Sequence, residues 1–272
     1  MARGCCCRNM TLSDIARRVK RGIREPHLFV RELNKYYYRY HQDRPNTVSF
    51  FDEDWDNLLI LDACRYDTFE QRHDLPGQLQ QRVTNSSSTP DFLETYLHGA
   101  DLTDTVYVTA NPQLHRKRDR IDVDLHDVIN IWQEDGWDEE FRTVQPETVA
   151  EAAQNAAERY PNKRLVVHFI QPHYPFIGPT GRKHLNLERL DFWNRVISGE
   201  INVPDEVLYQ AYEENLDLVL PHIENLLTEL PGKTVVTSDH GEMFGERAGP
   251  IPITEYGHPG NTYTPELTTV PW

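Results

Sequence analysis

The stretch Asn57-Leu-Leu-Ile-Leu-Asp62 decides the fold, because it is a short, continuous apolar run that ends in a carboxylate. Such a run, without polar alternation, is typical of a strand buried on both faces of a parallel sheet. Runs of the same kind lie at 105–110, 164–170 and 233–239, and each is followed by polar or proline-containing sequence. We therefore expect buried strands in these four segments.

Helical patterns lie between the apolar runs. They cover Pro90 to about His98, then 123–132, 146–159 and 207–230, and the last carries apolar residues at helical spacing. Strands that alternate with helices imply crossover connections and a mostly parallel sheet covered on both faces. The predicted fold is therefore α/β, a three-layer sandwich. Ligands bind such sheets beyond the carboxyl ends of the strands.

Length and composition limit the class of protein. The 272 residues are 38% hydrophobic, which is enough for the core of one large domain and excludes wholesale disorder. No apolar run approaches the roughly 20 residues of a membrane-spanning helix. The 28 Lys and Arg against 43 Asp and Glu exclude a general nucleic-acid binder. Because only six of the cations are Lys, the composition favours a halophilic protein; the alternative is an ordinary acidic enzyme.

Two regions are expected along the chain. Residues 1–54 are predicted to form a helical, basic N-terminal leader, and residues 55–272 the α/β domain. The leader has no apolar core typical of a secretory signal, so we expect a cytoplasmic location. The amphipathic pattern from Leu12 to Ile23 allows peripheral membrane contact by a basic helix. The alternative is a helix docked on the protein surface.

Two carboxylates and an imidazole follow the apolar runs. Asp62 ends the first run, and Asp239 and His240 follow the last, so all three are delivered to one edge of the sheet. Carboxylate oxygens with an imidazole suit a divalent metal such as Zn, Mn, Mg or Ca. Taken singly, an Asp at a strand end is more often a cap or turn residue.

A run of hydroxyls, Thr84-Asn-Ser-Ser-Ser-Thr89, directly precedes a predicted helix with Pro90 at its start. The positive end of a helix favours an anionic ester, and a metal can turn a nearby hydroxyl into a nucleophile. The candidates are Ser87, Ser88 and Thr89. The alternative interpretation is that Thr89 only caps the helix.

Three histidines complete the candidate site. His168 lies within the third apolar run, where it is either a core residue or a ligand. His173 follows that run between Pro172 and Pro175, in a rigid extended segment that can project a side chain into a site. His258 lies in a Gly- and Pro-containing loop that can also reach it.

Taken in order, these motifs resemble the alkaline phosphatase superfamily. They are a strand ending in Leu-Asp-x-x-Arg, hydroxyls before a helix, Pro-His-x-Pro-Phe, Ser-Asp-His-Gly-Glu and a Gly-His loop. The resemblance is closest to the sulfatase-like branch, which includes enzymes of the lipoteichoic acid synthase type. It covers roughly residues 55–272, and its most specific part is the segment 238–242.

The resemblance implies roles for individual residues. Asp62, Asp239 and His240 look like ligands of the metal that also binds the nucleophile. His173 and His258 look like residues that hold the non-bridging oxygens of the ester or a second metal, and His168 is grouped with them. Arg65 resembles the family arginine after the first Asp, and we expect it to pair with Asp67 or another carboxylate.

Departures from the family pattern bear on the chemistry. Classical sulfatases oxidise the Cys of Cys-x-Pro-x-Arg to formylglycine and carry two adjacent acidic residues at the first strand end. This chain lacks the motif, and Ala63 follows Asp62, so phosphate esters are favoured. The family also continues through another strand beyond the point where this sequence ends at Trp272, so a natural short form or a truncated one is expected.

The nucleophile stays open among three hydroxyls. Counting back from Phe92, as in the lipoteichoic-type pattern, selects Ser87. A nucleophile-x-Pro count selects Ser88, and helix capping selects Thr89. The sequence ranks Ser87 first, narrowly.

The favoured function is a metal-dependent hydrolase or transferase acting on phosphate mono- or diesters through a Ser or Thr nucleophile. The substrate expected is a small-molecule, glycan or lipid-linked ester. One alternative is a sulfate-ester hydrolase without formylglycine. The other is a sulfatase-like binding protein without turnover, although the complete set of candidate ligands argues against it.

Overall fold

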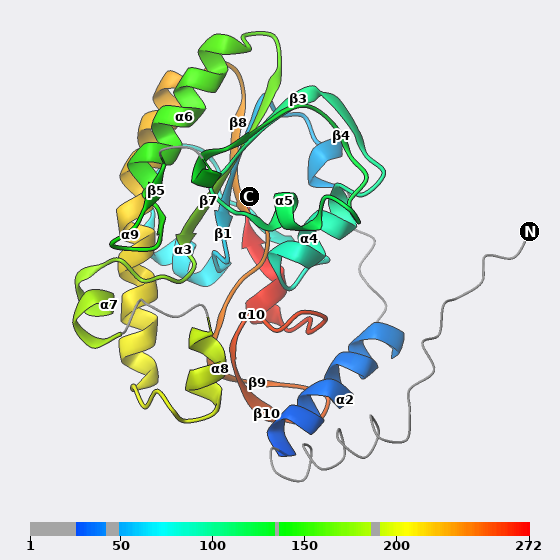
Figure 1. Cartoon of the computed structure of the whole chain (residues 1–272), viewed down its shortest axis with the longest axis vertical. Helices are drawn as coiled ribbons and strands as arrows, with labels where there is room; N and C mark the ends of the chain where they lie inside the picture. Colours follow the sequence, from blue (N-terminus) through cyan, green and yellow to red (C-terminus); the bar gives the residue numbers. More distant parts are fainter. Residues whose placement is uncertain (1–25, 42–48, 134–135, 186–190) are drawn as a thin grey trace, which may run out of the picture.

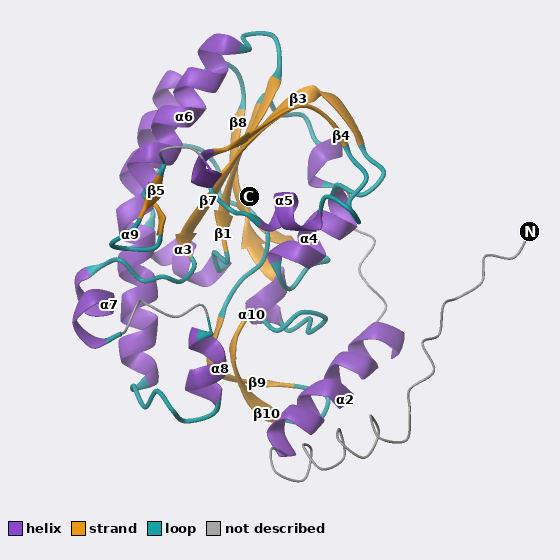
Figure 2. Cartoon of the chain, viewed as in Figure 1, coloured by secondary structure: helices purple, strands orange, loops and turns teal. Residues whose placement is uncertain are grey.

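The computed structural model describes residues 26–41, 49–133, 136–185 and 191–272. Its centre is a five-stranded sheet with the order β4-β3-β7-β1-β8 and parallel pairing throughout (Figures 1 and 2). The strands are β1 (Asn57–Asp62), β3 (Asp101–Thr109), β4 (Asp124–Asn130), β7 (Arg164–Pro172) and β8 (Thr234–Ser238). Every residue of β1 is buried, which accounts for its unbroken apolar sequence.

Helices cover both faces of the sheet. Leu59 and Leu61 of β1 belong to the core under α3 (Tyr66–Arg72), α6 (Pro146–Arg159) and α9 (Asp205–Glu229). Leu58 and Ile60 point the other way, into the core under α4 (Thr89–Tyr96), α5 (Gln113–Lys117) and the 3-10 helix η1 (Phe50–Asp52). The predicted three-layer α/β sandwich with a parallel central sheet is therefore confirmed (Figure 2).

One predicted helix is wrong. Residues 123–132 contain the edge strand β4 instead, with Tyr107 of β3 opposite Val128 and Val108 opposite Ile129. The β-branched pair Val128 and Ile129 suits an edge strand, and pairing with β3 outweighs the weak helical spacing of the segment. The other three predicted helices correspond to α4, α6 and α9.

Smaller elements surround the sandwich. They are the antiparallel pairs β2 (Gln81–Val83) with β11 (Thr269–Pro271), β5 (Trp137–Asp138) with β6 (Thr143–Val144) and β9 (Met243–Ala248) with β10 (Ile253–Gly257), the helices α7 (Pro179–His184), α8 (Phe192–Ile197) and α10 (Pro265–Thr268), and the 3-10 helix η2 (Ile131–Gln133). The loop after β10 carries His258, so the β9–β10 pair positions this residue of the candidate site.

Part of the predicted leader is helical. Helix α2 (Pro26–His41) packs on β10, where Arg31 pairs with the buried Glu255. The segment from Leu12 to Ile23 lies outside the described residues. The division at residue 54 stays a prediction, and Phe50 and Phe51, just ahead of it, are buried in the core of the sandwich. None of the helices in the described part of the chain is long and apolar enough to cross a membrane.

Candidate metal and nucleophile site

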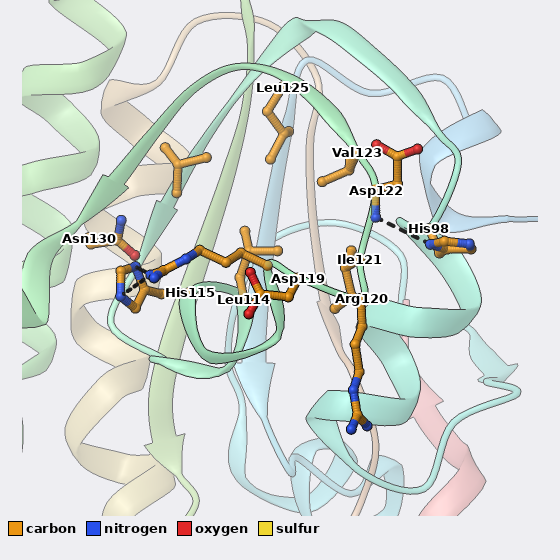
Figure 3. A pocket seen from close by; sticks show the side chains of 12 residues that line it. His98, Leu114, His115, Asp119, Arg120, Ile121, Asp122, Val123, Leu125 and Asn130 are labelled. Atoms are coloured by element: carbon orange, nitrogen blue, oxygen red, sulfur yellow. Dashed lines mark hydrogen bonds between the residues drawn. The ribbon is translucent and has the colours of Figure 1, made fainter.

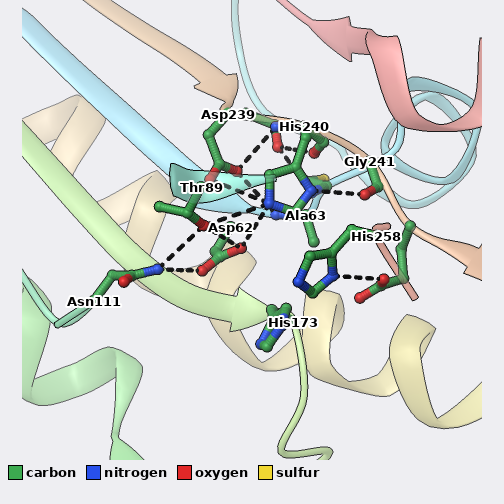
Figure 4. A network of polar contacts seen from close by, with 12 residues as sticks. Asp62, Ala63, Thr89, Asn111, His173, Asp239, His240, Gly241 and His258 are labelled. Carbon is green, nitrogen blue, oxygen red and sulfur yellow. Dashed lines mark hydrogen bonds and ion pairs between the residues drawn. The ribbon is translucent and has the colours of Figure 1, made fainter. Parts of the chain in front are cut away.

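Asp62, Asp239 and His240 meet at the carboxyl edge of the sheet (Figure 4). Strands β1 and β8 are parallel neighbours with Leu61 opposite Ser238, so the residues that follow them emerge side by side. Nε2 of His240 lies 3.5 Å from Oδ1 of Asp62 and 3.4 Å from Oδ2 of Asp239. All three side chains are buried. The convergence expected from the sequence is therefore present in the structure.

The ring of His240 is oriented by its own backbone. Nδ1 lies 2.8 Å from the carbonyl oxygen of Gly241 and donates to it, so the lone pair of Nε2 faces the two carboxylates. Burial, together with the nearby His258, holds the pKa of His240 well below its usual value, and the ring is neutral. A glycine is required at 241 because a Cβ there would lie 2.0 Å from the carbonyl oxygen of Glu266. A neutral imidazole fixed through Nδ1 is a typical metal ligand.

Ala63 adopts a left-handed backbone conformation directly after Asp62, with φ at +60°. Its N–H donates to Oδ1 of Asp239 at 3.1 Å, and its carbonyl accepts from the hydroxyl of Tyr212 at 2.8 Å. A non-glycine residue in this region is strained and persists only when its surroundings hold it there. The two hydrogen bonds provide that hold, and they fix Asp62 relative to Asp239.

The donor set fits a divalent cation. Oδ2 of Asp239, Nε2 of His168 and Oε2 of Glu242 are buried without a hydrogen-bond partner among the described residues. Burial and the charge of Asp239 raise the pKa of Asp62 well above its usual value, and burial also raises the pKa of Asp239. Buried carboxylates in close contact are costly unless a cation balances them.

The hydroxyls of the segment 84–89 occupy different places. Oγ of Ser86 donates to the carbonyl of Asp239 at 2.6 Å, and Oγ of Ser87 lies 3.3 Å from the carbonyl oxygen of Pro259. Only Thr89 reaches the carboxylates, with Oγ1 3.5 Å from Oδ1 of Asp62 and 3.4 Å from Nε2 of His240. The ranking of Ser87 first is thus not matched by the geometry, which places Thr89 at the cluster.

Thr89 is also not the cap of its helix. It is the first residue of α4, Ser88 is the N-cap, and the Ser88 side chain makes no capping hydrogen bond. This position leaves the Thr89 hydroxyl available to the site and sets it at the positive end of the helix.

Asn111 holds the carboxylate and the hydroxyl together. Its Nδ2 donates to Oδ2 of Asp62 at 2.6 Å and lies 3.4 Å from Oγ1 of Thr89. The residue follows β3, so a third strand contributes to the site. The sequence places Asn111 only near the strand ends and gives it no role.

A second group of side chains lies beside the first. His173, Glu242 and His258 offer ligand atoms within 4.8 Å of one another. Nδ1 of His258 lies 2.9 Å from Oε1 of Glu242, and the rings of His173 and His258 have centroids 4.8 Å apart (Figure 4). Burial lowers the pKa of His173 well below its usual value, whereas the Glu242 carboxylate outweighs the effect of burial and raises the pKa of His258.

Glu242 is a residue that the sequence analysis did not assign. It is fully buried, and burial raises its pKa. The signal was present, since Glu242 ends the Ser-Asp-His-Gly-Glu motif, but its contact with His258 depends on the loop after β10. Pairs of this kind, distant in sequence, follow from the tertiary structure.

His168 belongs to the cluster, because Asp62, His168 and Asp239 offer ligand atoms within 4.8 Å of one another. Nδ1 of His168 is 2.9 Å from the hydroxyl of Tyr107, and Nε2 lies 3.8 Å from Oδ2 of Asp239; burial lowers the His168 pKa to about 4. Arg65 makes a bidentate pair with Asp67, at 2.9 and 2.6 Å, in agreement with the expected pairing.

A cavity lies away from these residues. It has a volume of about 700 Å³ and lies between α5 and β4, with Leu114 and Ile121 on its apolar wall and His98, His115 and Arg118 among its polar lining (Figure 3). It contains none of the predicted site residues. The candidate site is therefore identified by the donor atoms at the carboxyl edge of the sheet and not by the volume of this cavity.

The fold and these donor groups define an α/β protein with a candidate metal centre at the carboxyl edge of its sheet. No family model and no curated protein matches the chain. Among solved structures, the C-terminal periplasmic domain of EcEptC from Escherichia coli, in complex with Zn, is 14% identical, with a TM-score of 0.49 and coverage of 84% of this chain and 75% of that one.

Two further structures are similar. The C-terminal periplasmic domain of the phosphoethanolamine transferase EptC from Campylobacter jejuni is 12% identical, with a TM-score of 0.49 and coverage of 79% of this chain and 78% of that one. A protein in the alkaline phosphatase superfamily from Vibrio parahaemolyticus is 11% identical, with a TM-score of 0.36 and coverage of 89% and 67%. The resemblance of the sequence motifs to the alkaline phosphatase superfamily stays a prediction.

The expected cytoplasmic location is corrected by these matches. Both EptC structures are periplasmic domains, and a cytoplasmic location is not retained for this chain. The expectation rested on the missing apolar core of a signal sequence, which is a weak criterion because it considers only the start of the sequence given. The halophilic character stays a prediction.

Proposed function

We propose that this protein is a metal-dependent hydrolase or transferase of phosphate esters that uses Thr89 as its nucleophile. The observation that carries the proposal is the position of the Thr89 hydroxyl at the start of α4, within 3.5 Å of both Asp62 and His240. A hydroxyl surrounded by metal-ligand groups at the positive end of a helix is suited to attack an anionic ester.

Asp62, Asp239 and His240 would hold the divalent cation, with the Thr89 hydroxyl beside it. The proposal is supported by the unpartnered Oδ2 of Asp239 and by the raised pKa values of both carboxyl groups. When bound, the cation balances the carboxylate charge and lowers the pKa of the adjacent hydroxyl.

The remaining groups are placed to act on the ester. The positive end of α4 can stabilise negative charge on the phosphoryl oxygens, and the Asn111 amide keeps the Thr89 oxygen in position. His173 and His258 lie on the other side of the cluster, facing the space next to His240 (Figure 4). They are placed to contact the ester oxygens or the leaving group.

The proposed reaction has two balanced steps. In the first step the Thr89 hydroxyl releases its proton to solvent, the bond from Oγ1 to phosphorus forms, the bond from phosphorus to the leaving oxygen breaks, and protonated His258 gives its proton to that oxygen. In the second step water or an acceptor hydroxyl attacks phosphorus and gives its proton to the now neutral His258, while the bond from phosphorus to Oγ1 breaks and Thr89 takes a proton back from solvent. Water as the attacking group gives hydrolysis, and an acceptor hydroxyl gives transfer. Glu242 supports the first step because it raises the pKa of His258.

Phosphate is favoured over sulfate by the state of Cys64, the cysteine among the described residues. Cys64 is fully buried, its pKa is raised well above the usual value by burial, and its backbone N–H is held by Ser238 at 2.8 Å. A thiol in this environment is a packing residue rather than a precursor of formylglycine.

The proposal is tested by assaying the metal-loaded full chain with an aryl phosphate, an aryl phosphodiester and an aryl sulfate. We expect phosphoester turnover that exceeds sulfate-ester turnover, and Thr89→Ala to lower kcat by at least about 10³-fold. Ser87→Ala is the matched control and should stay within a few-fold of the wild type. Turnover that survives Thr89→Ala but is lost in Ser87→Ala would overturn the assignment of the nucleophile. Preference for the sulfate ester would overturn the substrate class, and no turnover of any ester would favour a binding protein.

A further inference from the structure

Helix α2 has one face bound to the domain. Arg31 pairs with the buried Glu255, and the side chain of Asn34 exchanges two hydrogen bonds with the backbone of Ile251, at 2.8 and 3.0 Å. The ring of Tyr38 packs edge-on against an aromatic ring of the domain, with centroids 6.0 Å apart. Positions 31, 34 and 38 share one side of a helix. This side anchors α2 to the β9–β10 pair.

The opposite face carries large apolar side chains that remain exposed. The outer stripe of α2 consists of Phe29, Leu33, Tyr36 and Tyr40, which are 55%, 42%, 62% and 61% exposed. Their spacing of four, three and four residues places them in one line along the helix. Figure 1 shows α2 at the periphery, beyond β9 and β10 and away from the central sheet. A contiguous exposed apolar surface of this kind marks an interaction site.

The charge distribution indicates what this surface binds. Residues 1–41 contain ten Lys and Arg against three Asp and Glu, whereas the rest of the chain contains 18 against 40. The basic charge of an acidic protein is therefore concentrated in and ahead of α2. Aromatic side chains favour the interface between water and lipid, and clustered Arg and Lys favour anionic headgroups. The acidic remainder of a second copy would also attract this charge, but three of the four stripe residues are aromatic, which favours lipid over a second copy.

We propose that the outer stripe of α2 is a docking surface for an anionic lipid bilayer. The helix lies parallel to the membrane, with Phe29, Leu33, Tyr36 and Tyr40 at the headgroup boundary, and the net positive charge of residues 1–41 attracts the anionic headgroups. Strand β10, to which α2 is anchored, ends immediately before His258. Docking therefore holds the candidate site near the membrane surface. The inference does not depend on the proposed function.

The test is co-sedimentation of the full chain with vesicles of phosphatidylcholine alone and of phosphatidylcholine with about 30% phosphatidylglycerol. We expect binding to the anionic vesicles that weakens with added salt. Replacing the four stripe residues by Gln, which keeps helix propensity, should weaken this binding at least about tenfold. The matched control is Trp137→Gln with Leu218→Gln, two exposed apolar residues outside α2, and it should bind like the wild type.

Each outcome decides the proposal. Thr89→Ala should bind the vesicles like the wild type, which separates docking from catalysis. The single variant Tyr36→Gln, with a smaller loss of binding, replaces the fourfold variant if the latter does not fold by circular dichroism. The proposal is overturned if the wild type does not bind anionic vesicles or if the stripe variants bind them equally well. It is also overturned if sedimentation shows that the stripe joins two copies of the chain and that lipid has no effect.

Discussion

The hydroxyl of Thr89 lies 3.4 Å from Nε2 of His240, although the two residues are 151 positions apart in the sequence. One is the first residue of α4 and the other follows β8, so the contact joins the helix layer to the carboxyl edge of the sheet. The proposed chemistry depends on this contact, because it brings a hydroxyl next to Asp62 and Asp239.

The metal site is tested by the conservative change Asp239→Asn. Asp239 contributes the unpartnered Oδ2, and its other oxygen accepts from the N–H groups of Ala63 and His240 at 3.1 and 3.0 Å. We expect the wild type to bind a divalent cation and the variant to bind it at least about tenfold more weakly, because a neutral amide is a poorer ligand. Elemental analysis and competition with a chelator measure this. Equal metal content in both proteins would contradict the site.

The affinity for metal should rise with pH. Burial raises the pKa values of Asp62 and Asp239, so the metal-free carboxyl groups retain protons above their ordinary range near pH 4. The cation must displace those protons, and we expect roughly a tenfold gain in affinity per pH unit for each proton displaced. His240 does not compete, since its pKa is lowered. The measurement is a chelator competition between about pH 5 and pH 8.

The same shifts fix the sign of the stability change in metal-free protein. A carboxyl group whose pKa is raised by folding stabilises the folded state at low pH, and this contribution is lost as the pH rises through the raised value. The difference in Tm between metal-loaded and metal-free protein should therefore widen as the pH increases. A metal affinity that does not change with pH would show that the carboxyl groups are not the ligands.

Glu242→Gln should lower kcat/KM at least about tenfold, equivalent to about 1.4 kcal/mol of transition-state stabilisation. The change keeps the shape of the side chain but removes the charge that raises the pKa of His258. If His258 donates a proton, the fall in activity at high pH should move to lower pH in the variant. The pH dependence of kcat/KM measures this, with the exposed Glu94→Gln as the control. An unchanged pH profile contradicts the role of His258 as a proton donor.

Asn215 in α9 is expected to hold the segment that carries His173. Its Nδ2 lies 3.1 Å from the carbonyl oxygen of His173 and 2.9 Å from that of Pro175, and its Oδ1 accepts from the N–H of Ile177 at 2.8 Å. Asn215→Ala leaves these buried groups without a partner, so we expect a loss of about 1–3 kcal/mol in the free energy of unfolding. Denaturant unfolding should show little change for the exposed Asn225→Ala on the same helix. A loss in the free energy of unfolding no larger than that of the control would show that the segment carrying His173 does not depend on Asn215.

Much of the fold was predictable because the strands are buried on both faces. The apolar run before Asp62 needs no partner to be recognised, and parallel crossovers place the end of each such strand at the same edge. Asp62, Asp239 and His240 could therefore be grouped from the sequence alone. The edge strand β4 was missed because it is only partly buried and its identity depends on pairing with β3.

The choice among the hydroxyls was beyond the sequence for a physical reason. Whether Ser87, Ser88 or Thr89 faces the carboxylates depends on the residue at which α4 begins, and helix ends are uncertain by one or two residues in any sequence pattern. Contacts of Asn111, Asn215 and Glu242 were missed for a related reason. Each joins segments whose proximity arises only when the layers pack.

The most direct test of the central claim is to trap the covalent intermediate. The metal-loaded wild type is mixed rapidly with a phosphoester, quenched in acid and digested, and the peptide that spans residues 84–92 is analysed by mass spectrometry. The account predicts a phosphoryl group on Thr89, and none on this peptide from the Thr89→Ala variant. Modification of Ser87 or Ser88 instead, or phosphoester turnover with no modified peptide under conditions that trap a fast-forming intermediate, would contradict it.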